Sequence, residues 1–240
     1  MHVYANPARF LKIARPLTAW LGWAGVALIA LGLASGVFLA PPERLQGELV
    51  RILYIHVPAA WLGMGGWTGI AVASLMQLVW RHPLAAVAAR AVAVPGAVFT
   101  LVCLVTGSLW GRPAWGTYWE WDGRMTSMLV LLFLYLGYIA LAGAEKEKGG
   151  EGRLTAIYGL VGAVNLPIIH YSVIWWNTLH QGQSISFVRR TSTIDASMLW
   201  PLLTAAIGFA LLFGAVVLMR MRTELARNKV EARMRRMAAQ

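Results

Sequence analysis

Residues 110–124 hold four of the chain's twelve tryptophans together with charged and small residues. They read WGRPAWGTYWEWDGR, so the indole rings are mixed with one Glu, one Asp, two Arg and three Gly. This mixture is typical neither of a buried core segment nor of a solvated loop, because tryptophan has a large apolar body and one polar group. Two interpretations stay open: an aromatic platform at a membrane surface that holds a large flat ligand, or a dense form of the aromatic belt of membrane interfaces.

Two of the five histidines, His56 and His180, precede and follow this segment and fall on the same face once the chain is threaded through a membrane. Two imidazoles from different segments beside an aromatic surface are what bis-imidazole ligation of haem iron requires, because the iron takes axial ligands from opposite faces. The alternative for each is an interfacial side chain that hydrogen-bonds to backbone or lipid headgroups. His170 lies in an apolar run near Asn165 and Pro167, where a helix-packing hydrogen bond is the first choice and metal ligation the second.

Haem propionates need cations, and arginine suits them because its planar guanidinium matches a carboxylate. Zinc fits less well, because it takes three or four clustered ligands and only two histidines share this face. The single cysteine, Cys103, excludes an internal disulfide and covalent haem attachment of the c type. The sequence has neither a Gly-rich phosphate motif nor a nucleophile elbow. Whether the protein is an enzyme therefore stays open, but a carrier is favoured. Arginines on the face of the two histidines are candidates to bind the propionates, with Arg124 leading: Arg51, Arg112, Arg124, Arg189 and Arg190.

The elements that must position these residues are membrane helices. Of the 240 residues, 58% are hydrophobic and 13% are charged, whereas soluble domains are about 45–50% apolar and about 25% charged. Six apolar runs can each cross a hydrocarbon core of about 30 Å, which predicts an all-α polytopic membrane protein with a single membrane domain over residues 1–240. A kink is expected in the fifth run, at Asn165 and Pro167. The predicted spans are about 19–40, 53–80, 91–109, 125–142, 154–176 and 199–219.

The distribution of positive charge predicts the orientation of these spans. Residues 1–17 form a basic arm, and the first apolar run is too long for a signal peptide, so we expect it to be retained as a helix. The arm, the basic C-terminal tail and the two loops on their side carry 15 of the 21 Lys and Arg residues, and the three opposite loops carry six. Because cytoplasmic segments carry the excess, both termini are predicted to be cytoplasmic and the tryptophan-rich loop to face outward. The net charge of +11 then reflects topology and anionic lipid, and no nucleic-acid partner is expected.

Residue spacing in the loop allows two conformations. An extended chain places Trp115, Trp119 and Trp121 on one face, whereas a helix pairs Trp115 with Trp119 and turns Trp121 away. Asp122 directly precedes the fourth span, so we expect it to cap that helix rather than to contact iron. Arg124 can pair with Asp122 or reach a propionate.

At these residues the sequence resembles a known family. The stretch WGTYWEWD at 115–122 is similar to the WWD signature, Trp-Gly-x-x-Trp-x-Trp-Asp, of membrane proteins that handle haem during cytochrome c maturation. The small six-helix branch, the CcmC or haem exporter protein C family, fits the length and the number of spans. The resemblance runs from about residue 50 to 182 and includes IHVPAA at 55–60, GAVFT at 96–100, VTGS at 105–108, NLPIIHYSV at 165–173 and WWNTLHQG at 175–182.

The resemblance implies that haem b is held on the periplasmic face with His56 and His180 as axial ligands, the pair that the topology also selects. It implies that haem is kept oxidised and passed to the haem chaperone CcmE. It also implies an ABC transporter complex with the small subunit CcmD and the subunits CcmA and CcmB. Two positions depart from the pattern: Tyr118, where Trp is common, and Glu120, where an apolar residue is common. Because a carboxylate beside a propionate is unfavourable, we expect Glu120 to face solvent or a basic residue of a partner.

We therefore expect a haem carrier and handover subunit, with the indoles packed on the porphyrin. Two other classes of protein stay open. One is a small-molecule transporter whose aromatic loop is an outer gate, which predicts polar residues along a midplane pathway. The other is a structural subunit that binds partner helices and no cofactor. The residues expected to hold haem are His56, His180, Trp115, Trp119, Trp121, Asp122 and Arg124.

Overall fold

The computed structural model describes residues 6–148, 150, 152–176, 178–180, 182, 184–186 and 191–238. Within these residues, six helical segments are long and apolar enough to cross a membrane, as the sequence predicts. Two strands of two residues each, β1 (Ile185–Ser186) and β2 (Thr191–Ser192), pair antiparallel and form the only strand pair in this described part. The helices are α1 (Pro7–Phe38), the short 3-10 helix η1 (Glu48–Ile52), α2 (Leu53–Trp80), α3 (Ala85–Trp115), α4 (Gly123–Glu147), α5 (Arg153–Gly162), α6 (Asn165–Trp175) and α7 (Ala196–Ala238).

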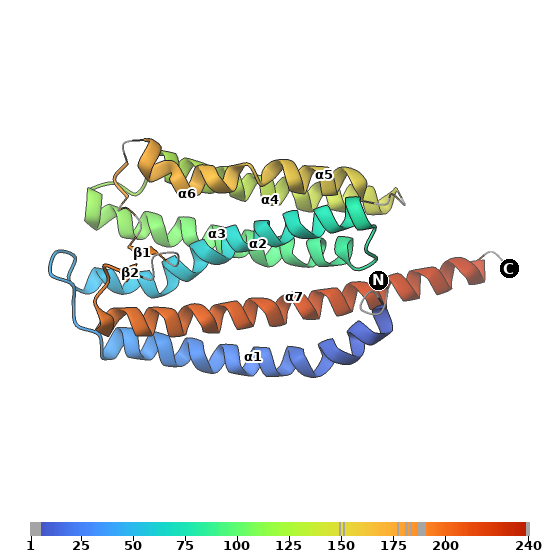
Figure 1. Cartoon of the computed structure of the whole chain (residues 1–240), viewed down its shortest axis with the longest axis horizontal. Coiled ribbons are helices and arrows are strands. Elements are labelled where there is room, and N and C mark those ends of the chain that lie inside the picture. Colours follow the sequence, from blue (N-terminus) through green and yellow to red (C-terminus); the bar gives the residue numbers. More distant parts are fainter. Residues whose placement is uncertain are drawn as a thin grey trace.

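The helices lie side by side along the long axis of the molecule (Figure 1). α1 packs on α7, α2 packs on α3, and α4 packs on α5 and α6. Both termini lie at one end of the bundle, which we call the terminal end. The connections between α1 and α2, between α3 and α4 and between α6 and α7 gather at the opposite end, which we call the loop end. Because the chain runs along the bundle an even number of times, both termini share one end. Three connections that are distant in the sequence therefore meet at the other end.

Several helices extend beyond the predicted spans. α1 begins at Pro7 rather than near residue 19, because Asn6 accepts a hydrogen bond from the Ala8 N–H at 2.9 Å and proline suits the first helical position. Part of the predicted basic arm is thus helical. α3 runs on to Trp115, so the first six residues of the loop predicted over 110–124 belong to a helix. α7 continues through the basic tail to Ala238. An apolar run marks the stretch inside the membrane and not the end of the helix.

Small residues bring α1 and α7 very close together. A Cβ atom on Gly32 would lie 2.5 Å from the backbone nitrogen of Ala205, and one on Gly25 would lie 2.8 Å from that of Leu212. A Cβ atom on Gly208 would likewise lie 2.6 Å from the backbone nitrogen of Ile29 on α1. Membrane helices associate through such close backbone approach, because lipid provides no hydrophobic driving force between them.

Aromatic side chains fill the core between α2, α3, α4 and α5. Trp67 is fully buried, with its ring centroid 4.9 Å from that of Tyr135 and 6.0 Å from that of Tyr138. The hydroxyl of Tyr135 donates to the carbonyl of Gly63 at 2.7 Å, so its polar group is satisfied. Gly96 leaves the space that the Tyr135 ring occupies. This core fixes α2, α3 and α4, the three helices that carry site residues at the loop end.

The fifth membrane crossing is broken, as predicted. α5 ends at Gly162 and α6 begins at Asn165, two positions before Pro167. The Asn165 side chain donates from Nδ2 to the carbonyl of Ser127 at 2.9 Å, which ties α6 to α4. Asn165 thus makes a helix-packing hydrogen bond in this crossing, whereas the expectation concerned His170.

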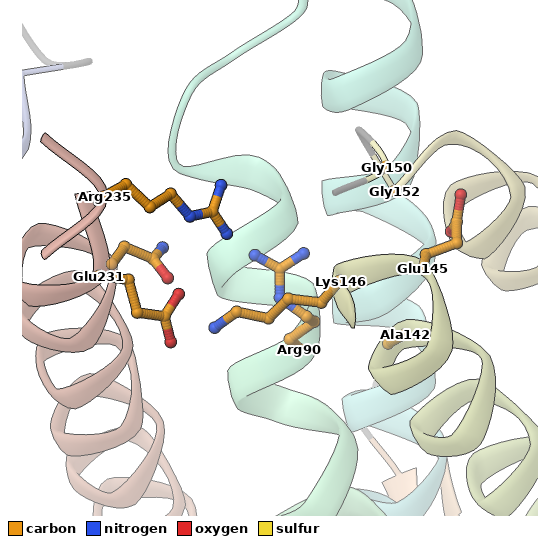
Figure 2. A pocket seen from close by; sticks show the side chains of 9 residues that line it. Arg90, Ala142, Glu145, Lys146, Gly150, Gly152, Glu231 and Arg235 are labelled. Carbon is orange, nitrogen blue, oxygen red and sulfur yellow. The ribbon is translucent and has the colours of Figure 1, made fainter. Parts of the chain in front are cut away.

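Charged side chains hold the last part of α7 at the terminal end. Glu224 lies 2.6 Å from Nε of Arg90 on α3 and 3.9 Å from Nζ of Lys146 on α4. Further along α7, Glu231 and Arg235 face Arg90 and Lys146 across a polar cavity of about 210 Å³ (Figure 2). The ion pairs of Glu224 tie the start of the basic tail to α3 and α4, whereas the last turns of α7 project past the other helices (Figure 1).

Candidate functional site

The tryptophan-rich segment begins in the last turns of α3 and ends in the first turn of α4. Gly116 adopts a left-handed φ of 84°, and its N–H donates to the carbonyl of Arg112 at 3.0 Å, which ends α3. Arg112 in turn donates from Nη1 to the carbonyl of Gly116 at 2.7 Å, and its guanidinium lies 5.7 Å from the centre of the Tyr118 ring. Arg112 is thus engaged within the loop. Because Trp115 is helical and residues 117–122 are not, neither of the two uniform conformations applies to the whole segment.

Asp122 caps α4, as predicted, and also binds His180. Its Oδ1 accepts from the N–H of Met125 at 2.7 Å, and its Oδ2 lies 2.6 Å from Nδ1 of His180 and accepts from the hydroxyl of Thr178. Burial disfavours the charge on this carboxylate, but the hydrogen bonds from Thr178, Met125 and His180 outweigh it and hold its pKa below the usual value. The carboxylate is therefore ionised and accepts hydrogen bonds through both oxygens.

His180 is held from two sides. The centroid of its imidazole lies 4.7 Å from that of Trp115, at an interplanar angle of 64°. Its side chain is 16% exposed, and burial lowers its pKa although the hydrogen bond and the charge of Asp122 oppose that shift. A neutral imidazole that donates through Nδ1 to a carboxylate leaves Nε2 as its electron-pair donor, which is the state in which histidine binds metals.

His56 lies in the first turn of α2 at the same end of the bundle. Its Nδ1 is 3.0 Å from Oγ1 of Thr106 on α3, and its ring meets that of Trp110 edge-on, with centroids 5.6 Å apart and planes at 88°. A Cβ on Gly107 would lie 3.0 Å from Cε1 of His56, so a glycine is needed where the imidazole crosses α3. Nε1 of Trp110 donates to Oε1 of Gln46 at 2.7 Å, which anchors that indole to the connection between α1 and α2.

Arg124 lies close to both histidines. Its positive charge acts on the imidazoles of both His56 and His180. The Nε atom of Arg124 is buried and has no hydrogen-bond partner among the described residues. An unpaired guanidinium nitrogen removed from water is costly unless an anion joins it. This atom therefore indicates a place for a negatively charged group of a ligand.

The remaining tryptophans of the segment differ in exposure. Trp119 packs against the core of the bundle, and its buried Nε1 has no partner within the described residues. Trp121 is 73% exposed, and its ring centroid lies 5.4 Å from that of Trp119. Glu120 is exposed, as expected. Trp115, Trp119 and Trp121 thus do not form one flat layer: Trp115 covers an imidazole, and Trp121 lies at the surface.

Other candidates lie apart from this cluster or outside the described residues. His170 is on the exposed face of α6, with its ring centroid 4.8 Å from that of Tyr171. Nε of Arg51 forms an ion pair with Glu48 at 2.5 Å. Arg189 and Arg190 lie outside the described residues. Across the part of the chain that the structure describes, no group of three or more His, Cys, Asp or Glu side chains is arranged to hold a metal ion.

Sequence reasoning did not select three residues that complete the cluster. Thr106, Trp110 and Thr178 each contact an imidazole or its carboxylate partner. A hydroxyl inside an apolar span next to a glycine, as at Thr106, is a signal that can be read from sequence. Trp110 stands in the tryptophan-rich segment, but nothing in the sequence pattern links it to His56, 54 positions earlier.

Comparisons with known proteins agree on one family. The sequence model of the CcmC family, described as "Heme exporter protein C", matches residues 1–236. The chain is 52% identical over 228 residues to the "Heme exporter protein C" of Bradyrhizobium diazoefficiens, covering 95% of this chain and 86% of that protein. It is 48% identical over 222 residues to the protein of that name from Escherichia coli K12, covering 92% and 89% of the two chains. For the Rhodobacter capsulatus protein the identity is 41% over 231 residues, covering 95% of each chain.

Proposed function

This chain belongs to the haem exporter protein C family, and from that premise we propose that it is a haem carrier of cytochrome c maturation. In this proposal, it binds haem b at the loop end and hands it to a membrane-anchored chaperone. The observation that carries the proposal is the pair His56 and His180, which come from the first turn of α2 and from the connection between α6 and α7. They lie at one end of the bundle, and each engages Nδ1 with a neighbouring oxygen.

The donor set fits haem. Iron in haem accepts one imidazole on each face, and both histidines keep Nε2 as the remaining donor atom. The positive charge of Arg124 acts on both imidazoles. The unpaired Nε of Arg124 suits a propionate, because guanidinium and carboxylate form charge-assisted hydrogen bonds. The unpartnered Nε1 of Trp119 offers one further donor at the site.

The tryptophans have different roles in this proposal. Trp110 and Trp115 each pack against one of the two imidazoles and restrict its rotation. Trp119 and Trp121 supply the apolar surface on which a porphyrin packs, and the exposed Trp121 marks the edge that a partner reaches. Asp122 acts through His180 and not on the iron. Haem, when bound, supplies the redox and vinyl chemistry, and the protein holds and orients it.

The orientation predicted from charge places this site outside the cytoplasm. The terminal end carries the excess of Lys and Arg, so we propose that it is cytoplasmic and that the loop end faces the periplasm of a bacterial inner membrane. We further propose CcmE as the acceptor of haem and CcmD, CcmA and CcmB as partners in an ABC transporter complex, as the family relationship implies. Exposed Tyr118, Glu120 and Trp121 form the part of the loop available to such a partner.

The experiment is an absorption spectrum of the purified protein with and without added haem. We expect a Soret band of a low-spin haem with two nitrogen ligands, and we expect His56→Ala and His180→Ala each to shift or abolish it. His170→Ala is the matched control, because His170 lies on the exposed face of α6, and it should leave the spectrum unchanged.

Two results would contradict the proposal. Unchanged spectra in both site variants would remove the ligand assignment. A colourless preparation that takes up no haem but still co-purifies with partner subunits would support a purely structural role instead. The transporter alternative has no specific support among the polar residues at midplane depth, because Asn165 is bonded to α4 and His170 is exposed on α6.

A further inference from the structure

The two imidazoles at the loop end are held by different kinds of hydrogen-bond partner. His180 faces the carboxylate of Asp122 at 2.6 Å, and His56 faces the hydroxyl of Thr106 at 3.0 Å. Because the nature of that partner sets how strongly the opposite ring nitrogen donates to a metal, the two histidines are chemically unequal.

The tautomer of His56 follows from where the Thr106 proton goes. The hydroxyl of Thr106 lies 2.7 Å from the carbonyl of Val102 and 3.2 Å from that of Cys103, both of which only accept. Its proton is therefore directed to its own helix, and its oxygen faces Nδ1 of His56 as an acceptor. Nδ1 must then carry the hydrogen, which leaves Nε2 of His56 unprotonated.

The tautomer of His180 follows from Asp122. An ionised carboxylate only accepts hydrogen bonds, and this one receives the Met125 N–H at Oδ1 and the Thr178 hydroxyl at Oδ2. The Nδ1 atom beside Oδ2 must therefore be a donor, and in the neutral imidazole this leaves Nε2 of His180 unprotonated. His180 lies in a connection rather than a helix, and Asp122, as the cap of α4, is what holds it in place.

From these contacts, and resting on the function proposed above, we propose that Thr106 and Asp122 are positioning residues that make His180 the firm axial ligand and His56 the exchangeable one. A hydrogen bond to a charged acceptor is roughly twice as strong as one to a neutral acceptor and makes the imidazole the better donor. Only neutral groups support His56, namely the hydroxyl of Thr106 and a backbone hydrogen bond to Cys103. With haem bound, an incoming ligand, whether a small anion or a side chain of an acceptor protein, would therefore replace His56 rather than His180.

The first test needs no haem. In the haem-free protein labelled with ¹⁵N-histidine, long-range proton–nitrogen correlation spectra distinguish the Nδ1–H from the Nε2–H tautomer, and we expect Nδ1–H at both His56 and His180. Thr106→Val removes the acceptor while keeping the shape of the side chain, so it should change the signals of His56 and leave those of His180. Thr106→Ser keeps the hydroxyl and should resemble the parent protein. An Nε2–H tautomer at His56 in the parent, or unchanged His56 signals in Thr106→Val, would overturn the positioning role of Thr106.

The second test compares ligand exchange in the haem-loaded protein. Cyanide is the probe, because it binds oxidised haem and changes its absorption spectrum when it replaces an imidazole. We expect Thr106→Val to lower the cyanide concentration for half replacement by about 10-fold, the order of effect that loss of a supporting residue has on metal ligation. Thr106→Ser should stay close to the parent.

These outcomes separate the inference from the function on which it rests. Equal cyanide binding in the parent and Thr106→Val would show that His56 is not the exchangeable ligand, while haem binding itself stands. A parent protein that takes up no haem would remove the proposed function, and the tautomer measurement would still decide whether Thr106 and Asp122 orient the imidazoles.

Discussion

The carboxylate of Asp122 lies 2.6 Å from Nδ1 of His180, although 58 positions separate the two residues. The contact joins the tryptophan-rich segment to the connection between α6 and α7. The same carboxylate caps α4 through the N–H of Met125. One side chain therefore determines both where α4 begins and how the imidazole is turned.

Replacing Asp122 by Asn should separate these two roles. Asparagine caps helices about as well as aspartate, so the melting temperature of the haem-free protein should change little. With its one oxygen at the Met125 N–H, however, the amide presents NH2 to His180 and can no longer accept from Nδ1. We expect haem affinity, measured by absorption titration, to fall by roughly 10- to 100-fold.

Asp195→Asn is the matched control for that variant. Asp195 is exposed and accepts from the Ser197 N–H at 2.8 Å, next to the start of α7, and among the described residues it makes no hydrogen bond to either histidine. Its replacement should leave haem binding unchanged. Parent-like haem affinity in Asp122→Asn would mean that Asp122 serves only as the cap of α4.

Arg124→Gln should weaken haem binding without weakening the fold. The buried Nε of Arg124 has no partner in the described part of the chain, so its removal leaves no partner unsatisfied there. If Arg124 binds a propionate, its loss should lower haem affinity about 10-fold, since hydrogen bonds to charged groups contribute about 1.5–3 kcal/mol. Haem titration measures the first effect and thermal melting the second. A variant that melts earlier but binds haem normally would assign Arg124 to the fold.

The sequence was sufficient for the features that hydropathy and local chemistry control. Six apolar runs predicted the six membrane-length helices, and Pro167 with Asn165 predicted the break between α5 and α6. The even number of runs predicted that both termini share one end, and Asp122 was recognised as a helix cap because it directly precedes an apolar run. Each of these depends on residues within one segment.

The sequence was not sufficient for features that depend on how helices pack. The pairs His56–Thr106 and Asp122–His180 join residues 50 and 58 positions apart, and the rotation of each helix decides which side chains meet. The extension of α3 to Trp115 was also missed, because the left-handed Gly116 and not the end of the apolar run stops the helix.

Gly32→Ala should destabilise the contact between α1 and α7. The added Cβ would lie 2.5 Å from the nitrogen and 2.8 Å from Cα of Ala205, and backbone atoms cannot move aside cheaply. We expect a loss of about 1–3 kcal/mol, the usual cost of overpacking, and a lower melting temperature in detergent. Gly65→Ala is the control, because a Cβ there meets nothing within 4 Å, and it should be neutral or stabilising. Equal melting of the two variants would show that α1 and α7 are not held this closely.

Glu224→Ala should release the last part of α7 from the bundle. The Glu224 side chain is 15% exposed and lies 2.6 Å from Nε of Arg90, so its loss leaves a half-buried guanidinium without its carboxylate. We expect a loss of about 1–3 kcal/mol and faster tryptic cleavage after Arg227 and the later basic residues. Glu231→Ala is the matched control, because its partner Arg227 is 72% exposed and pairs on α7 itself, so melting should hardly change. Equally fast cleavage in both variants would mean that Glu224 does not hold α7, and that the cluster drawn in Figure 2 is only a solvated polar surface.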